Sequence, residues 1–166
     1  MKELFLVRHA KSDWGNMELK DIDRPLKDRG IRDALLMGEF ILKEYNIPDK
    51  VITSPACRAF HTAVLLLRAM KSAGRRIHVE DGIYLASFNE LESVVKNTED
   101  EVGCLMLVGH NPGITDLANF FIEEFIHNIP TSGFVFFRFE TSAWQKIAAS
   151  NMISHQIQYP KKILNT

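Results

Sequence analysis

Short apolar runs alternate with longer amphipathic stretches along this chain. The apolar runs are four to eight residues long, which is typical of strands. We expect strands at 4–7, 50–53, 76–80, 104–110, 133–140 and 153–160. Apolar residues recur at helical spacing between these runs, and we expect helices at about 28–45, 55–74, 89–97 and 111–126.

The start of the second helix is indicated by Ser54 and Pro55, because serine is a preferred N-cap residue and proline suits the first helical position. The apolar positions of the first three helices predict the residues that face the core. These are Ile31, Ala34, Leu35, Gly38, Ile41, Leu42 and Tyr45; Ala59, Ala63, Leu66, Leu67 and Met70; and Leu91, Val94 and Val95.

The order of these elements predicts an α/β fold. Strands and helices alternate through most of the chain, and a pair of strands closes it. This order is typical of a three-layer α/β/α sandwich with a mixed, mostly parallel central sheet. With 166 residues, the chain suits a single domain over 1–166.

Composition excludes several classes of protein. Hydrophobic residues make up 46% and charged residues 25%, as in soluble globular proteins, and the net charge is −1. The chain therefore has no bulk attraction to nucleic acid or to a membrane, and an anion site must be local. No apolar stretch approaches the ~20 residues of a membrane span, and the run at 4–7 is too short for a signal peptide, so we expect a cytoplasmic protein.

Cys57 and Cys104 are the two cysteines of the chain. Two isolated cysteines form neither a disulfide framework nor a metal-binding spacing. We interpret both as small buried residues.

Cationic side chains follow three of the predicted strands. Arg8 and His9 come after the first, Arg58 lies just beyond the second, and His110 follows the strand at 104–110. Ligands of open α/β sheets bind at the carboxyl ends of the strands, and helix N-termini there also favour anions. Arginine matches phosphate oxygens bidentately, so the pattern predicts a phosphate pocket.

Each of these residues has a simpler explanation when taken alone. Arg8 or His9 could pair with a nearby aspartate, Arg58 could have an acidic partner, and His110 could be a core histidine bonded to backbone. The joint pattern favours the pocket. We expect no metal there, because the arginines would repel a cation. The remaining histidines are expected at the surface or half-buried: His61, His78, His127 and His155.

Four segments carry a family resemblance. They read LFLVRHAKSDW, DIDRPLKDRG, VITSPACRAFHTA and LMLVGHNPGI, in that order. They resemble the signature segments of the histidine phosphatase superfamily (phosphoglycerate mutase-like, branch 1), and RPLKDRG with the short length is most similar to its SixA-like phosphohistidine phosphatases. The resemblance implies a phosphoglycerate mutase-like fold and a reaction without metal or cofactor.

The resemblance also implies roles for individual residues. His9 would be the nucleophile that becomes phosphorylated, Arg8 and Arg58 would hold the phosphoryl oxygens, and His110 would complete the pocket.

Two further residues match more weakly. Ser12 would contact the phosphate. Arg24 would either flank the pocket or form a salt bridge with Asp21 or Asp23, and the sequence does not decide between these two.

The chain departs from the family pattern after the RH pair. Ala10 stands where many members have glycine, and Lys11 replaces the usual acid. We expect Lys11 to be solvated.

A second departure concerns the general acid. Many members carry a catalytic glutamate after the third strand, where this chain has Tyr84 and Leu85. An alkoxide leaving group needs an acid, whereas the leaving nitrogen of phosphohistidine, with a conjugate-acid pKa of about 6.5, needs much less help. Three carboxylates remain open as substitutes: Asp13, Asp81 and Glu90.

We therefore expect a metal-independent phosphatase for phosphohistidine on a protein. The alternatives are a small-molecule phosphomonoester phosphatase or mutase, a phosphate-binding module without turnover, and an α/β domain with structural cations. The expected partner is a phosphorylated protein or small phosphate ester, and not nucleic acid or membrane. The oligomeric state stays open, because FVFFRF suits either a core strand or an edge interface.

Overall fold

A six-stranded sheet forms the centre of the computed structural model, which describes residues 1–165. Thr166, the last residue of the predicted domain, lies outside the described residues. The strands are β1 Lys2–Arg8, β2 Lys50–Thr53, β3 Ile77–Val79, β4 Cys104–Gly109, β5 Phe134–Phe139 and β6 Met152–Gln158. Their order in the sheet is β3-β2-β4-β1-β5-β6. The neighbouring strands among β3, β2, β4 and β1 pair in parallel, whereas β5 is antiparallel to both β1 and β6. The predicted mixed, mostly parallel sheet is confirmed.

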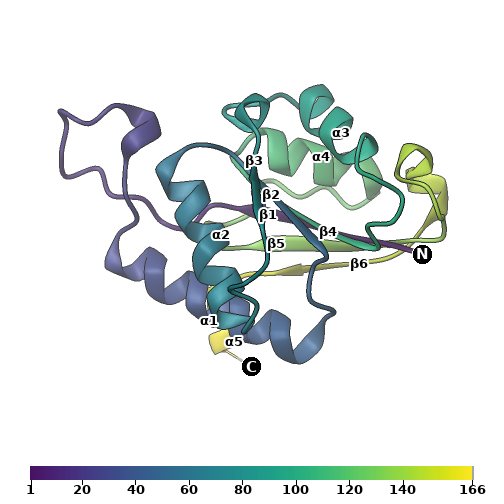
Figure 1. Cartoon of the computed structure of the whole chain (residues 1–166), viewed down its shortest axis with the longest axis horizontal. Helices are drawn as coiled ribbons and strands as arrows, with labels where there is room; N and C mark the ends of the chain where they lie inside the picture. Colours follow the sequence, from purple (N-terminus) through teal and green to yellow (C-terminus); the bar gives the residue numbers. More distant parts are fainter. Residues whose placement is uncertain (166) are drawn as a thin grey trace.

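Helices cover both faces of the sheet. They are α1 Asp28–Glu44, α2 Cys57–Ala69, α3 Phe88–Lys96, α4 Gly113–Phe121 and α5 Pro160–Leu164, with 3-10 turns η1 Asp21–Asp23, η2 Asp81–Ile83, η3 Trp144–Lys146 and η4 Ala149–Asn151. α1, α2 and α5 lie on one side and α3 and α4 on the other (Figure 1). The predicted three-layer fold is confirmed. Within residues 1–165, no helix is long and apolar enough to cross a membrane.

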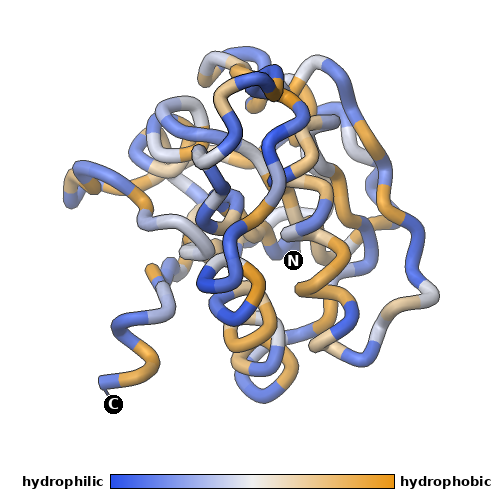
Figure 2. Tube along the Cα trace, turned by 90° about the vertical axis from the view of Figure 1, so that its left-hand side faces the viewer, coloured by the Kyte–Doolittle hydropathy of each residue, from blue (hydrophilic) through white to orange (hydrophobic). Residues whose placement is uncertain are grey.

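Two hydrophobic cores flank the sheet, and β1 contributes to both. Leu4 and Leu6 pack with α3 and α4, while Phe5 and Val7 pack with α1 and α2. A strand covered on both faces reads as a continuous apolar run, which is why the sequence lacks alternation there. Along the helices, hydrophobic and hydrophilic residues alternate around the turns (Figure 2).

The segment FVFFRF, for which the sequence allowed either a core strand or an edge interface, forms β5. The strand lies between β1 and β6, and all its residues except Arg138 are buried. It is therefore a core strand. β6 forms that edge of the sheet and is largely exposed.

The start of α2 differs from the prediction. The helix begins at Cys57 and ends at Ala69, so Ser54 is not its N-cap. Ser54 instead accepts a hydrogen bond from the Ala56 amide (3.2 Å) and lies 2.8 Å from His110 Nε2. The prediction was wrong because the hydroxyl is used by a residue distant in sequence. The core-facing residues predicted for α2 are all buried: Ala59, Ala63, Leu66, Leu67 and Met70.

Other predictions of burial were confirmed only in part. In α1, Ile31 is exposed and Met37 is buried in its stead. Cys104 is buried, but Cys57 is only half-buried because it lies at the outer start of α2, with its Sγ 3.7 Å from His61 Nδ1. His61, His78, His127 and His155 are exposed, as predicted.

Candidate active site

The candidate site lies at the carboxyl ends of β1, β2 and β4. Arg8 and His9 end β1, Ser54 follows β2, and His110 follows β4. These strands are neighbours and run in parallel, so their ends meet. The rings of His9 and His110 lie with centroids 5.1 Å apart. Residues separated by a hundred positions in the sequence are thus brought together, as predicted.

His9 is held in one tautomer by its own loop. Its Nδ1 lies 2.8 Å from the carbonyl oxygen of Ala10. A carbonyl can only accept, so Nδ1 carries the proton and Nε2 keeps its lone pair. Burial, with the nearby Arg58 and Arg8 charges, lowers the pKa of His9 to about 4, against opposing effects of the Ala10 bond and Asp21. At neutral pH the ring is therefore neutral, the state in which an imidazole can act as a nucleophile.

His110 is oriented by Ser54. The Ser54 hydroxyl oxygen accepts the Ala56 N–H and lies 2.8 Å from His110 Nε2, which fixes the orientation of the ring. Nδ1 of His110 is buried and has no partner among residues 1–165. Burial, followed by the charges of His9 and Arg58, lowers the pKa of His110 to about 3. The ring is thus neutral at neutral pH.

Arg8 is anchored by the loop before β5. Its Nη1 donates to Asn128 Oδ1 (3.1 Å) and to the Ile129 carbonyl (2.8 Å). Asn111, the residue after His110, donates to the same two acceptors. Nε of Arg8 is buried and has no protein acceptor among the described residues. Burial lowers the pKa of Arg8, so an anion next to it would be bound in a poorly solvated position.

Arg58 lies on the first turn of α2 and is buried. A cation at a helix N-terminus is unfavourable, and Asp21 compensates for it. Nη2 of Arg58 donates to Asp21 Oδ2 at 2.8 Å, and Nη1 donates to the Asp21 carbonyl. A guanidinium has five N–H groups, so three remain for another anion. The acidic partner expected for an isolated arginine exists, but it lies inside the candidate pocket.

Asp21 is a site residue that the sequence did not single out as one. Its Oδ2 also accepts from the Tyr84 hydroxyl at 2.7 Å. Tyr84 stands where the family acid is expected, and its ring meets that of His110 edge-on at 5.7 Å. Burial alone would raise the pKa of Asp21, but the bonds from Tyr84 and Arg58 and the charge of Arg24 lower it overall. The same bond raises the pKa of Tyr84.

Arg24 was predicted either to flank the pocket or to form a salt bridge with Asp21 or Asp23, and the structure shows the ion pair with Asp21. Its Nη1 lies 3.7 Å from Asp21 Oδ1, and its guanidinium stacks on Trp14 at 3.6 Å. Because Asp21 also binds Arg58, this ion pair places Arg24 beside the candidate pocket. Its contact with substrate stays a prediction.

Ser12 is buried in the loop that follows β1, and its backbone pairs with Leu26. Its contact with phosphate also stays a prediction. Lys11 is exposed, so the solvated interpretation is confirmed.

Thr62 was missed in the sequence. Its buried hydroxyl accepts the Ala10 N–H (2.9 Å) and donates to the Arg58 carbonyl (2.6 Å). It therefore joins the backbone behind His9 to the helix turn that carries Arg58. The signal was its position four residues after Arg58, which places both on one helix face.

Ser132 was also missed. It adopts a left-handed backbone conformation (φ 61°), which is uncommon for serine. Its N–H reaches the His9 carbonyl at 3.3 Å, and its buried Oγ has no partner among the described residues. Nothing in the sequence around it indicates this conformation.

The sequence of this chain matches a known protein family. The family model of the histidine phosphatase superfamily (branch 1) matches residues 4–102. The chain belongs to this superfamily. An uncharacterised protein of Mycobacterium tuberculosis is 32% identical over 112 residues, covering 68% of this chain and 67% of that protein. An uncharacterised chloroplastic protein of Arabidopsis thaliana is 25% identical over 71% of this chain, which spans 58% of the relative's length.

Solved structures of SixA proteins share the fold of this chain. One from Agrobacterium tumefaciens, provisionally named phosphohistidine phosphatase SixA, has a TM-score of 0.78 and 26% identity over 93% of this chain and 97% of that one. A protein histidine phosphatase SixA solved with tungstate has a TM-score of 0.77 and 17% identity over 97% and 99%. The likeness to SixA proteins expected from the motifs is confirmed.

The three carboxylates considered as substitutes for the family's acid are placed elsewhere. Asp13 accepts from the Gly15 amide (3.0 Å) and lies 3.5 Å from Lys27 Nζ. Glu90 caps α3 by accepting from Ser87, and Asp81 is exposed on η2. In the described part of the chain, none of these three carboxylates has a hydrogen bond or ion pair with Arg8, His9, Arg58 or His110.

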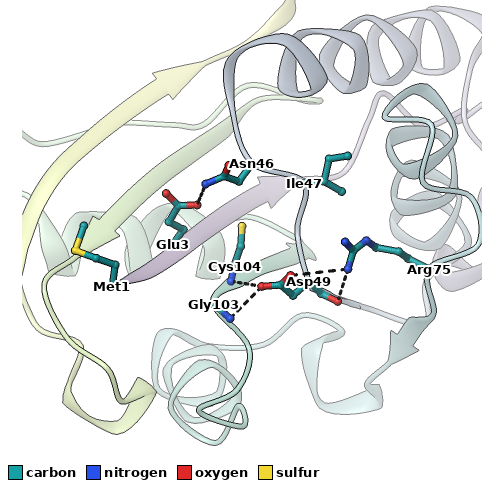
Figure 3. Close-up of a pocket in the computed structure, with 8 residues that line it drawn as sticks. All are labelled: Met1, Glu3, Asn46, Ile47, Asp49, Arg75, Gly103 and Cys104. Atoms are coloured by element: carbon teal, nitrogen blue, oxygen red, sulfur yellow. Dashed lines mark hydrogen bonds and ion pairs between the residues drawn. The ribbon is translucent and has the colours of Figure 1, made fainter.

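A separate pocket of about 580 Å³ opens at the other end of the same strands (Figure 3). It is lined by residues at the starts of β1 and β4, and its polar groups pair with one another. Asp49 accepts from the Gly103 and Cys104 amides, and Glu3 accepts from Asn46. The arginine and histidine site thus lies at one edge of the sheet, and this internally paired pocket lies at the other. No group of three or more His, Cys, Asp or Glu that could hold a metal occurs within residues 1–165.

Proposed function

We propose that this chain is a metal-independent phosphatase that acts through a phosphohistidine intermediate on His9. Its substrate would be a phosphohistidine side chain of another protein. The observation that carries the proposal is a neutral imidazole surrounded by donors that have no acceptor in the protein.

Unsatisfied buried polar atoms are rare in native proteins and cost free energy, on the order of 1–3 kcal/mol each. In residues 1–165 such side-chain atoms occur only in and beside this site. They are Arg8 Nε, Arg24 Nε and Nη1, His110 Nδ1 and Ser132 Oγ. A phosphoryl group presents several acceptor oxygens, so a bound phosphoryl group would satisfy donors that the protein leaves free.

The arrangement supports a two-step transfer. In the first step, Nε2 of His9 attacks phosphorus while Arg8, Arg58 and His110 stabilise the charge on the equatorial oxygens. The bond from phosphorus to the leaving group breaks, and its electron pair departs with that group. In the second step, water attacks the phosphorus on His9 and releases phosphate and the neutral ring.

The absence of a suitable acid favours a nitrogen leaving group. Among the described residues, the carboxylates of Asp13, Asp81 and Glu90 have no hydrogen bond or ion pair with His9 or His110, and Tyr84 has a raised pKa because its hydroxyl is bonded to Asp21. An alcohol leaving group would require proton donation. The leaving imidazole of phosphohistidine, with an ordinary pKa of about 6.5, does not.

The relatives support this proposal to different degrees. The SixA structure that holds tungstate is called a protein histidine phosphatase, and tungstate is a phosphate analogue. In contrast, a 2,3-bisphosphoglycerate-dependent phosphoglycerate mutase of Clavibacter michiganensis is 34% identical over 76 residues, which cover 29% of that enzyme. That match supports the alternative of a small phosphate ester as substrate.

One structural observation also favours this alternative. Asp21 is a carboxylate within the site, and a carboxylic acid there could protonate an alcohol. However, Arg58 and Tyr84 hold its pKa below the ordinary range, which keeps it ionised at neutral pH. Asp21 is thus poorly suited to donate a proton, and the phosphohistidine substrate is favoured.

The test compares two substrates in the presence of EDTA: a peptide that carries phosphohistidine, and p-nitrophenyl phosphate. The wild-type chain is measured beside His9→Ala and the matched surface variant His155→Ala. We expect hydrolysis of the N–P bond that survives chelation, disappears in His9→Ala and persists in His155→Ala, with weak hydrolysis of the ester.

Other results would reverse the conclusion. Equal or faster ester hydrolysis would mean that the site does not select a nitrogen leaving group, and a small phosphate ester would become the preferred substrate. Binding of tungstate without turnover of either compound would identify a binding module.

A further inference from the structure

Asp21 brings a carboxylate into the site, although transfer from a nitrogen requires no acid. Tyr84 and Arg58 both donate to its Oδ2, at 2.7 and 2.8 Å. Its other oxygen, Oδ1, has Arg24 at 3.7 Å, beyond hydrogen-bond distance. The side chain is 41% exposed, so a ligand can reach it from solvent. The carboxylate is therefore fixed in place while one oxygen remains able to accept a bond.

The charge of Asp21 calls for a counterpart on the substrate. Its lowered pKa keeps it ionised at neutral pH, and an anion beside a phosphate site repels an anionic substrate. The titratable side chains that face it or act on it from neighbouring elements are Arg24, Arg58, Tyr84, His9 and His110. Arg58 and Arg24 already offset part of this charge, and an N–H group on the leaving group would add a favourable contact that a phosphate ester lacks.

We propose that Asp21 is a specificity-determining residue that accepts a hydrogen bond from the free ring N–H of the substrate phosphohistidine. The inference rests on the proposed function and identifies the residue that distinguishes phosphohistidine from a phosphate ester. In an in-line transfer, the leaving ring points away from His9. Asp21 is the carboxylate of the site with a partly exposed side chain, and in this proposal the leaving ring lies beside it.

The step balances without proton transfer to Asp21. The substrate ring is protonated on the nitrogen that does not carry phosphorus. His9 Nε2 forms a bond to phosphorus, the old P–N bond breaks, and its electron pair returns to the leaving nitrogen. The ring departs as neutral imidazole with its proton still in place. Asp21 stabilises the positive charge that the ring carries during this transfer, whereas an alcohol leaving group offers it no such bond.

The test uses Asp21→Asn, which removes the charge but keeps an oxygen for Arg58 and Tyr84. Asp23→Asn is the matched control, because Asp23 is exposed on the same 3-10 turn. The ratio of kcat/KM for the phosphohistidine peptide to that for p-nitrophenyl phosphate is measured at pH 6 and pH 8. A bond to a charged group corresponds to roughly tenfold or more. We expect Asp21→Asn to lower this ratio about tenfold at pH 8 and less at pH 6, where the substrate ring is protonated without help. Asp23→Asn should leave it unchanged.

A second variant keeps the inference testable if Asp21→Asn folds poorly. Tyr84→Phe removes one bond to Asp21 but not its charge, and it should lower the ratio to a smaller extent. If Asp21→Asn changes both substrates equally, Asp21 only positions or competes for Arg58, and the inference is wrong. If the wild-type chain fails to hydrolyse the phosphohistidine peptide, the proposed function fails and the inference with it.

Discussion

Burial of two neutral histidines should make this protein sensitive to acid. The pKa of His9 is lowered to about 4 and that of His110 to about 3, chiefly by burial. The unfolded chain, with ordinary pKa values near 6.5, takes up protons that the folded chain excludes. The stability from these rings is therefore complete above pH 6.5 and is lost as pH falls, down to about pH 4 for His9 and pH 3 for His110.

The size of the effect follows from linkage. Each pH unit within the window costs about 1.4 kcal/mol per histidine. Between pH 7 and pH 5, each ring therefore lowers the free energy of unfolding by about 2 kcal/mol, and the two together by ~4 kcal/mol. Domains of this kind have a free energy of unfolding of about 5–15 kcal/mol, so the expected loss is a large fraction of the stability.

The assay is urea unfolding at pH 7 and pH 5, followed by circular dichroism and by tryptophan fluorescence. Trp144 is fully buried and reports on the core. In His9→Asn, which lacks one of the two rings, the loss between the two pH values should shrink by about 2 kcal/mol. The exposed control His155→Asn should keep the wild-type loss. A difference between wild type and His9→Asn below about 0.5 kcal/mol would refute the reasoning, since linkage requires the larger value.

Two further predictions concern the support of the site. Thr62→Val keeps the shape of the side chain but leaves the buried Ala10 N–H without its acceptor, so we expect a loss of about 1–3 kcal/mol in urea unfolding together with slower turnover, both largely restored in Thr62→Ser. Gly30→Ala would place a Cβ 2.3 Å from the Lys11 carbonyl oxygen, so it should lower the melting temperature and the N–P hydrolysis rate, while Gly74→Ala, with open space around it, should change neither. A Gly30→Ala variant with wild-type rate and stability would contradict this packing argument.

Much of the architecture could be predicted because it depends on sequence patterns that extend over a few residues. Apolar runs marked the strands, and helical spacing marked the helices. The three strand ends that are followed by Arg8 and His9, by Arg58 and by His110 could be brought together by topology alone, since parallel neighbouring strands end at one edge. Those predictions rest on rules that act over a few residues or on the order of the elements.

The parts that failed depend on contacts between distant segments. Ser54 has the sequence signature of a helix cap, yet its hydroxyl bonds His110, 56 residues away. Asp21 lies in a long polar loop with no periodicity. That loop is folded back by backbone bonds such as the one from the Lys27 amide to the Lys11 carbonyl. No local pattern shows that such a loop directs a carboxylate onto Arg58.

This division between strand ends and loop also separates the two tasks of the proposed enzyme. Arg8, His9 and His110 are held by the central strands, whose rigid ends suit the transfer of a phosphoryl group common to all substrates. Asp21 is supplied by the loop of residues 9–27, which projects beyond that edge of the sheet (Figure 1). Loops can change without disturbing the core, so a leaving-group preference placed there can vary while the chemistry is kept. Specificity in this fold should therefore follow the loop that contacts the leaving group, and substitutions there should alter the choice between N–P and O–P bonds before they abolish turnover.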